Sequence, residues 1–320
     1  MARSTTVVPL NLTLIPELAQ AKFSDTLDID QDGQLLYLGD NWSGGVDVFD
    51  ISTPQPVFRK TIKLRGRIYG VVLAKNVGKV FVGMTGSVLA ALDTGPDNKV
   101  LAQIHTGGSG HVDLIDYDPD HKTIFAANRL DGFMACVDAV TNEMVGRVEG
   151  LGGGLEQPRF NPVDGMVYLT DNRENVLYQI DPVAIRLVNT FKIADDCFPN
   201  GMAINPENNQ AVLACSNKDR PHTLIWDLTR QQIDSVIDES GNADGVVYEA
   251  TLDRFLVAAS GSSQGPVVGI FGGTPVRFLT KVPTVAGASW VAYDRKHKLV
   301  YVPASESGKP ALVSFTMPDD

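Results

Sequence analysis

The sequence lacks the features that mark membrane and secreted proteins. No stretch approaches the roughly 18 consecutive apolar residues of a membrane helix. The N-terminus has no apolar core of the kind that a secretory signal peptide needs. Cysteines occur only at Cys136, Cys197 and Cys215, and their spacing is not that of a metal site. We therefore expect three reduced thiols in a cytoplasmic protein that does not contact membranes.

Basic residues are also scarce. The chain has 27 lysines and arginines against 38 acidic residues, which gives a formal net charge of −11. A nucleic-acid-binding protein needs a clustered basic face, so we expect no nucleic-acid partner. The sequence has no Gly-x-Ser-x-Gly elbow, phosphate-binding loop or dinucleotide fingerprint. These absences disfavour serine-hydrolase and nucleotide-dependent chemistry.

What the sequence does have is a regular internal repeat. Apolar, β-branched runs recur every 43 to 45 residues, beginning at Leu35, Lys79, Thr123, Met166, Gln210, Arg254 and Leu299. A period near 44 across the whole chain indicates repeated supersecondary units that bury their faces against their neighbours. The 30 glycines and 18 prolines suit many tight turns better than long helices.

Each repeat is predicted to form four short strands. In the fifth repeat we expect strands at 201–205, 210–215, 223–227 and 233–237, separated by turns rich in Asn, Asp, Gly and Pro. Such units around an axis form an all-β, seven-bladed β-propeller with four antiparallel strands per blade. We expect residues 1–320 to form this single domain. The last repeat has three strands, so residues 7–14 are predicted to supply its fourth and to cover two sheet edges.

Most third strands end in aspartate. The aspartates are Asp50, Asp93, Asp138, Asp181 and Asp227. A short acceptor beside a turn most simply accepts hydrogen bonds from nearby backbone N–H groups. We therefore predict a structural role for these five carboxylates.

The second strands resemble those of the YVTN-type propellers. Residues 79–84 (KVFVGM), 123–128 (TIFAAN) and 166–171 (MVYLTD) stand where that family has its tyrosine-valine-threonine-asparagine segment. The resemblance covers nearly the whole chain and implies the seven-bladed fold. Propellers of this type serve many functions, so the resemblance does not specify one.

Polar residues occupy equivalent positions at one end of the repeats. Ten residues before the second strands lie Asp25, Tyr69, Asp113, Glu156, Asn200, Asp244 and Ser289. Six residues after the second strands begin lie Asn41, Thr85, Arg129, Asn172, Ser216, Ser260 and Ser305. In a propeller, first strands begin and second strands end at the same channel mouth. Two polar rings are therefore expected to converge on one concave site.

Four carboxylates around a narrow mouth raise one another's pKa unless something relieves their repulsion. A bound cation, a cationic substrate, or a raised pKa that turns one carboxyl into a general acid would each do so. A hard divalent ion, Ca²⁺ above all, prefers carboxylate and amide oxygens of this kind. Zinc is disfavoured, because the ring has no cysteine and only one histidine nearby.

Two short segments resemble the gluconolactonase, paraoxonase and diisopropylfluorophosphatase propellers. They are PNGMA from residue 199 and ADGV from residue 243. Those enzymes hold a catalytic calcium on a Glu, Asn and Asp set, which implies Asn200 and Asp244 as metal ligands. Asp25 stands where that family has a glutamate, and Glu156 where it commonly has another asparagine. These two positions depart from the family pattern, and many members have six blades.

Further residues complete the candidate site. His111 and Asp113 are predicted to act as a base and its orienting carboxylate, with Glu156 as a second catalytic carboxylate. Residues expected to contact a substrate are Arg67, Arg129, Asn172, Tyr69, Trp42, Trp290 and Phe198. The two arginines can instead pair with ring acids, which would weaken the case for a metal.

The sequence leaves three functions open. The first is metal-assisted hydrolysis of a small lactone or ester, in which the ion polarises the carbonyl and a side chain activates water. The second uses the same carboxylates without metal, as acid and base of a lyase, isomerase or cyclase. The third is a non-catalytic binding or scaffold propeller that contacts a protein partner.

Overall fold

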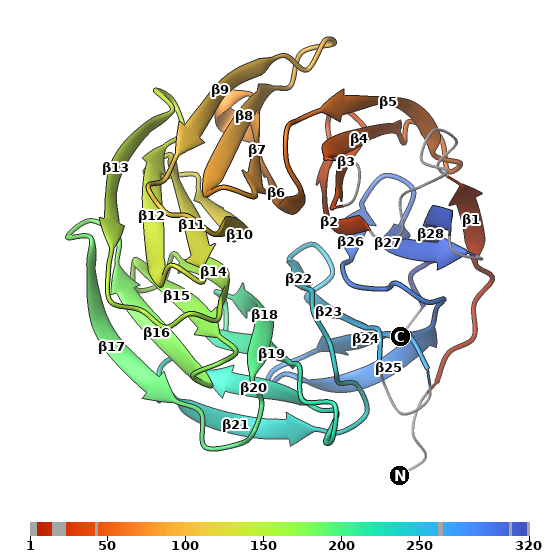
Figure 1. Ribbon diagram of the computed structural model, residues 1–320. Coiled ribbons are helices and arrows are strands. Elements are labelled where there is room, and N and C mark those ends of the chain that lie inside the picture. Colours follow the sequence, from red (N-terminus) through yellow and green to blue (C-terminus); the bar gives the residue numbers. More distant parts are fainter. Residues whose placement is uncertain (1–4, 15–23, 42–43, 262–264, 307–308, 319–320) are drawn as a thin grey trace.

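Seven four-stranded antiparallel sheets form a ring around a central channel (Figure 1). The structure is a computed structural model that describes residues 5–14, 24–41, 44–261, 265–306 and 309–318. Within these residues the only helical segment is the 3₁₀ turn η1 (Lys75–Val77). The prediction of an all-β, seven-bladed propeller is confirmed. No helix in the described part of the chain is long and apolar enough to cross a bilayer.

The strands of each blade follow one another outward from the channel. The inner strands are β2 (Ser24–Asp30), β6 (Ile68–Ala74), β10 (His111–Asp118), β14 (Leu155–Asn161), β18 (Pro199–Asn205), β22 (Val246–Glu249) and β26 (Ala292–Asp294). The second strands are β3 (Leu35–Asp40), β7 (Lys79–Met84), β11 (Thr123–Arg129), β15 (Met166–Asp171), β19 (Gln210–Cys215), β23 (Arg254–Ala259) and β27 (Leu299–Glu306). All seven second strands begin at the residue that the repeat predicts.

The third and outer strands complete the blades. The third strands are β4 (Gly45–Asp50), β8 (Val88–Asp93), β12 (Phe133–Asp138), β16 (Val176–Asp181), β20 (Thr223–Asp227), β24 (Val267–Gly272) and β28 (Lys309–Thr316). The outer strands are β5 (Val57–Lys63), β9 (Val100–His105), β13 (Glu143–Val148), β17 (Arg186–Lys192), β21 (Gln232–Ile237), β25 (Arg277–Pro283) and β1 (Asn11–Leu14). Blades one to six begin at β2, β6, β10, β14, β18 and β22, and blade seven holds β26, β27, β28 and β1.

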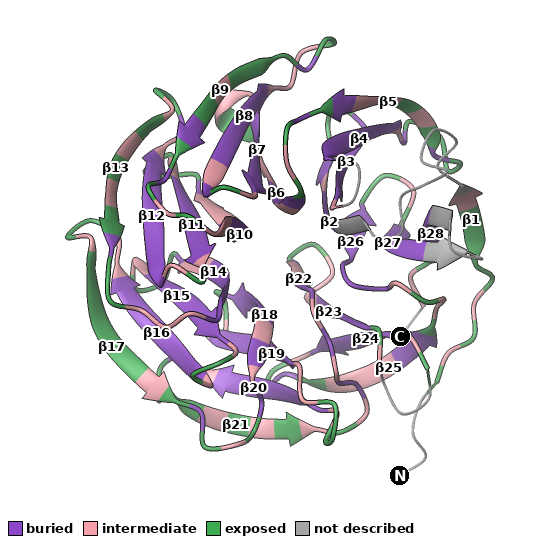
Figure 2. Cartoon of the chain, in the orientation of Figure 1, coloured by how far each residue is buried: buried purple, intermediate pink, exposed green. Residues whose placement is uncertain are grey.

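The core lies between neighbouring blades. Tyr37, Val46 and Val48 of blade one pack on Val80 and Val82 of blade two, and all five are at most 1% exposed. Apolar side chains on both faces of the second and third strands fill these layers, while the outer strands face solvent (Figure 2). Each blade therefore depends on its neighbours for burial.

The aspartates that end the third strands accept hydrogen bonds from the turn that follows. Asp138 Oδ1 accepts from the backbone N–H groups of Val140 and Thr141, at 2.7 and 2.8 Å. Corresponding bonds form at Asp50, Asp93, Asp181 and Asp227. The predicted structural role of these carboxylates is confirmed.

The N-terminal strand completes the seventh blade as predicted. β1 pairs with β28 in antiparallel register from Asn11↔Ser314 to Leu14↔Ala311. The strand is shorter than the expected 7–14, because Pro9 has no N–H to donate to a ladder. Thr6 instead donates its N–H to the carbonyl of Lys281 in blade six, at 2.9 Å. The packing of β2 against β26 and β27 joins the first and last blades.

Two cysteines differ from the expectation of reduced thiols. Cys197 and Cys215 form a disulfide, with their Cα atoms 4.5 Å apart, whereas Cys136 is a buried free thiol. The pair is separated by 18 residues, which hides its proximity in the sequence. Cys215 lies opposite Pro199 in the ladder between β18 and β19, so the residue two before Pro199 lies close to it.

We expect Cys215→Ser to lower the free energy of unfolding by about 3 kcal/mol, the usual contribution of a disulfide that closes a loop of this length. Urea denaturation with and without dithiothreitol measures the effect. The reductant should lower the midpoint of the wild type but not that of the variant. Cys136→Ser is the control that leaves the disulfide in place. Equal midpoints for wild type and Cys215→Ser would show that the bond adds nothing to stability.

Candidate functional site

The predicted polar ring lies at backbone bulges in the inner strands. The register of β10 shifts between Val112 and Ile115, that of β14 between Leu155 and Pro158, and that of β18 between Pro199 and Met202. These intervals contain Asp113, Glu156 and Asn200. A bulge inserts an extra residue into a strand and can redirect a side chain, which explains how three neighbouring blades turn their ring residues into the channel.

Two positions beside the ring require glycine for a steric reason. A Cβ on Gly201 would lie 2.1 Å from the carbonyl oxygen of Asp244, and the Gly201 N–H donates to that oxygen at 2.8 Å. A Cβ on Gly245 would lie 2.5 Å from the indole of Trp290. The Asn-Gly and Asp-Gly pairs therefore serve close approach between neighbouring blades rather than tight turns.

The ring residues surround a cavity of about 400 Å³ at the channel mouth. Its lining contains nine predicted site residues: Tyr69, His111, Asp113, Arg129, Glu156, Asn172, Asn200, Asp244 and Trp290. Asn41 of the second ring and Leu114 complete it. Reasoning from the repeat thus brought together residues from six blades.

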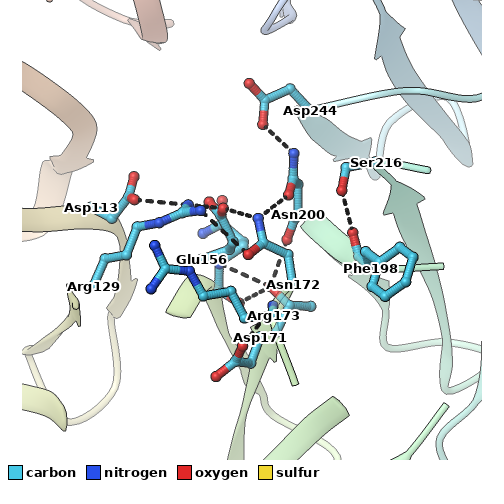
Figure 3. A network of polar contacts seen from close by, with 12 residues as sticks. Asp113, Arg129, Glu156, Asp171, Asn172, Arg173, Phe198, Asn200, Ser216 and Asp244 are labelled. Carbon is cyan, nitrogen blue, oxygen red and sulfur yellow. Dashed lines mark hydrogen bonds and ion pairs between the residues drawn. The ribbon is translucent and has the colours of Figure 1, made fainter. Parts of the chain in front are cut away.

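Among the described side chains, the predicted residues Arg67 and Phe198 are not part of this lining. Arg67 is exposed, and its backbone N–H donates to Thr85 Oγ1 at 3.2 Å. Phe198 has a φ of 50°, and its carbonyl accepts from Ser216 Oγ at 2.7 Å (Figure 3). Asp25 lies on β2, and its side chain is outside the described part of the structure, as is the whole of Trp42.

Arg129 lies at the centre of the mouth. Its Nη1 forms ion pairs with Glu156 Oε1 and with Asp113 Oδ2, the latter at 3.3 Å, and its Nη2 donates to Asn172 Oδ1 at 3.3 Å (Figure 3). The side chains of Glu156 and Asp113 are 6% and 11% exposed. Poorly solvated carboxylates need a partner of opposite charge, and the guanidinium supplies it to both.

Amide side chains extend this network across the mouth. Asn172 Nδ2 donates to Glu156 Oε1 at 2.6 Å and to Asn200 Oδ1 at 2.8 Å. Asn200 Nδ2 donates in turn to Asp244 Oδ1 at 3.1 Å. A continuous chain of polar contacts therefore runs from Asp113 in blade three to Asp244 in blade six.

Asp244 ends this chain, and no cationic side chain among the described residues forms an ion pair with it. Burial, followed by the negative charge of Asp113, raises the pKa of its carboxyl from 3.8 to about 6. The hydrogen bond from Asn200 and the charge of Arg129 oppose the rise. A carboxyl that titrates near pH 6 beside a cavity can donate or accept a proton near neutral pH.

Three aromatic side chains contribute to the lining of the mouth. Tyr69 and His111 stack with ring centroids 4.2 Å apart. His111 Nε2 lies 3.2 Å from Asp113 Oδ2, so the predicted base and its carboxylate are in contact. Trp290 lines the cavity while only 7% exposed.

One feature of the ring opposes calcium binding. The carboxylates of Glu156 and Asp113 face Arg129, whose positive charge opposes a second cation at the same oxygens. Among the described side chains, the one group of three close metal-ligating residues is Cys197, Cys215 and His222, and both sulfurs of that group are in the disulfide. Calcium binding by Asp25, Glu156, Asn200 and Asp244 stays a prediction.

Sequence reasoning missed charged residues deeper in the channel. Asp28, Asp116 and Arg159 lie on inner strands and line a second cavity. The sequence feature that could have identified them is a charged side chain inside a strand predicted to line the channel, at a position that belongs to neither polar ring.

The comparisons with known proteins agree on the fold alone. No protein-family model matches the sequence, and no curated protein matches it. Among solved structures, a chain of the "Crystal Structure of Mitotic Checkpoint Complex" superposes with a TM-score of 0.79 over 100% of this chain and 94% of that one. The two sequences are 12% identical. This protein is therefore similar to a known propeller in architecture, and the two family resemblances in its sequence stay predictions.

Proposed function

We propose that this chain is a binding propeller whose channel mouth holds a small, hydroxylated organic molecule. The observation that carries the proposal is the continuous chain of carboxylate and amide groups around a cavity of about 400 Å³. Hydroxyl groups can donate to its oxygens and accept from its N–H groups. The rings of Tyr69, His111 and Trp290, which line the cavity, offer apolar contact to a carbon skeleton.

The charge of the mouth supports a donor-rich ligand. Asp113, Glu156 and Asp244 place three carboxyl groups around the mouth, and the charge of Arg129 offsets part of theirs. The excess of acceptors favours ligands that bring hydrogen-bond donors and disfavours anions. A polyol or sugar derivative has this chemistry.

The test is the substitution Asp244→Asn, which keeps size and removes charge. The raised pKa means that the fold disfavours the ionised carboxyl, so its cost to stability appears as pH rises from about 4 to about 6. We expect the variant to be more stable than wild type by roughly 2 kcal/mol at pH 7.5 and no more stable at pH 4. Binding of the ligand should nevertheless weaken by tenfold or more.

Thermal shift and calorimetry with a panel of monosaccharides, sugar acids, sugar lactones and cyclitols measure the binding. The control is Asp97→Asn, which removes a carboxylate that is 74% exposed and lies outside the ring positions. It should change neither the stability of the protein nor its affinity for the ligand. If the panel contains no binder while Asp244→Asn still stabilises, the mouth holds only water and the proposal fails.

A second candidate is metal-free acid–base chemistry at the same site. The contact between His111 and Asp113 and the pKa of about 6 at Asp244 favour it. Turnover of a bound panel member, followed by NMR, would distinguish an enzyme from a binding protein. EDTA should leave the melting temperature unchanged, whereas a fall that Ca²⁺ reverses would favour metal-assisted lactone or ester hydrolysis.

A scaffold function would use the outer surface of the propeller to contact a protein partner. Val145 of β13 and Leu187 and Val188 of β17 are exposed by 57%, 37% and 38%, and they belong to the exposed outer strands of adjacent blades (Figure 2). The similar propeller chain named above belongs to a protein complex. A protein partner on this rim is compatible with a ligand in the mouth, because the two surfaces are separate.

A further inference from the structure

A second cavity, of about 420 Å³, lies in the channel beyond the mouth. Along β10 the mouth uses His111 and Asp113, whereas this cavity uses Asp116 and Tyr117 and the turn residues that follow them. It therefore lies toward the other end of the channel. We call it the lower chamber, defined by Asp28, Asp116, Arg159, Phe160, Tyr248 and Trp290.

One carboxylate of the lower chamber is fully partnered. Asp116 Oδ1 pairs with Arg159 Nη1 at 2.9 Å, and Asp116 Oδ2 accepts from the Phe160 N–H at 2.8 Å. Arg159 Nε donates to the Met202 carbonyl at 2.8 Å, so the guanidinium is held in place. Asp116 thus has a backbone donor and a cation, both supplied by the next blade.

Asp28 occupies the equivalent position two blades earlier. It lies opposite Tyr37 as Asp116 lies opposite Phe125, 88 residues later in both strands. Its Oδ2 accepts from the Leu73 N–H of the next blade at 2.8 Å, as Asp116 does from Phe160, and its Oδ1 accepts from the Ile29 N–H at 2.8 Å.

The cation is what differs between the two positions. Val72 pairs with Phe81 where Arg159 pairs with Tyr168, so valine stands at the arginine position beside Asp28. The same backbone geometry therefore presents a carboxylate without the guanidinium that completes its counterpart. Comparison of these two repeats within the chain therefore identifies an arginine guanidinium as the group that Asp28 lacks.

The rest of the lower chamber suits an organic cation. Among the residues that the structure describes, the charged groups that line it with Asp28 are Asp116, Arg159 and Asp120, which gives this lining a net negative charge. Burial raises the pKa of Asp28 to about 6, and the hydrogen bonds from the Leu73 and Ile29 N–H groups and the charge of Arg159 lower it only in part. Rings of Phe160, Tyr248 and Trp290 line the same space, and aromatic faces attract cations.

We propose that the lower chamber binds a small aryl- or alkylamine whose ammonium group contacts Asp28 as the Arg159 guanidinium contacts Asp116. The apolar part of the amine lies against the aromatic lining. This site lies beyond the mouth, with which it shares Trp290, and the proposal does not rest on the ligand proposed there.

The probe is 2-phenylethylamine, with neutral 2-phenylethanol and anionic phenylacetate as matched compounds of similar size. Calorimetry at pH 7.5 should show binding of the amine and at least tenfold weaker binding of the other two. Affinity for the amine should fall about tenfold between pH 7.5 and pH 5, because protonation of Asp28 removes the charge that the ammonium contacts. The pH titration uses wild-type protein and so does not depend on any variant folding.

Variants locate the site. Asp28→Asn should weaken amine binding tenfold or more, and Val72→Arg should abolish it by supplying the missing guanidinium. Val72→Met tests size without charge, and Asp32→Asn removes a nearby carboxylate that is 85% exposed; both should leave binding within about twofold. Thermal melting shows which variants are folded.

Three results would overturn the proposal. The first is equal affinity for the amine and the alcohol, and the second is an amine affinity that does not change between pH 7.5 and pH 5. The third is loss of amine binding in Asp244→Asn but not in Asp28→Asn, which would place the amine in the mouth. Failure of the sugar panel at the mouth has no bearing on these results.

Discussion

Replacing Arg129 with methionine is expected to lower the free energy of unfolding by about 3–5 kcal/mol, the usual cost of removing one partner of a buried ion pair. The side chain of Arg129 is 22% exposed, and it neutralises Glu156 and Asp113, which are more buried still. Methionine keeps much of the side-chain volume, so the variant isolates the loss of charge and of the donors to Asn172. Urea denaturation at pH 7.5 measures the change.

A second substitution separates electrostatics from packing. Adding Glu156→Gln to Arg129→Met removes one carboxylate that the first change leaves unpaired, and it should restore part of the lost stability. Arg129→Lys keeps the charge but not the forked donor set, so an intermediate loss is expected. An unchanged midpoint in Arg129→Met would mean that the mouth solvates its carboxylates well, and the network described here would not contribute to stability.

Gly201→Ala is the second substitution with a large expected effect. Its Cβ would lie 2.1 Å from the Asp244 carbonyl oxygen and 3.1 Å from the Val246 nitrogen, and both are backbone atoms that cannot rotate away. Blades five and six would have to separate, which also weakens the bond between the Gly201 N–H and that oxygen. We expect a loss of about 3 kcal/mol or more, as for severe overpacking combined with a lost hydrogen bond.

Gly153→Ala is the matched control, because the nearest atom to its added Cβ is 3.6 Å away. It should change the melting temperature little, while Gly201→Ala should lower it by several degrees. Because Gly201 follows Asn200, the same substitution should also weaken binding at the mouth. Normal stability and binding in Gly201→Ala would show that the two inner strands lie farther apart than in this structure.

The fold could be predicted from the sequence because its main determinant is periodic. A spacing of 43 to 45 residues fixed the first residue of all seven second strands, from Leu35 to Leu299. Strand boundaries were harder to predict where backbone groups form hydrogen bonds outside their own sheet. The carbonyl of Ser289, a ring position, accepts from the Gly245 N–H of blade six, and the last inner strand begins only at Ala292.

The sequence predicted which residues form the site, but not which of them form ion pairs and hydrogen bonds with one another. The repeat predicted that Asp113, Glu156, Asn200 and Asp244 lie at one channel mouth. It gives no information on the distances between side chains of different blades. Whether a carboxylate faces a metal ion or a guanidinium depends on side-chain rotamers and on neighbours in other blades. The position of Arg129 in the second ring made its pairing conceivable, and only the three-dimensional arrangement shows which acids it contacts.

The chain of contacts from Asp113 to Asp244 makes the blades unequal despite their common architecture. Blades three to six each contribute a link, in fixed order: carboxylate and arginine, carboxylate and amide, amide, carboxylate. An extra repeat inserted between blades three and six would pack well on its neighbours but would break this succession. The same repeat inserted between blades seven and one would leave it whole. An inserted repeat would thus leave these contacts intact outside the arc of blades three to six and break them within it, so a ring of similar units has one arc whose length the polar contacts limit.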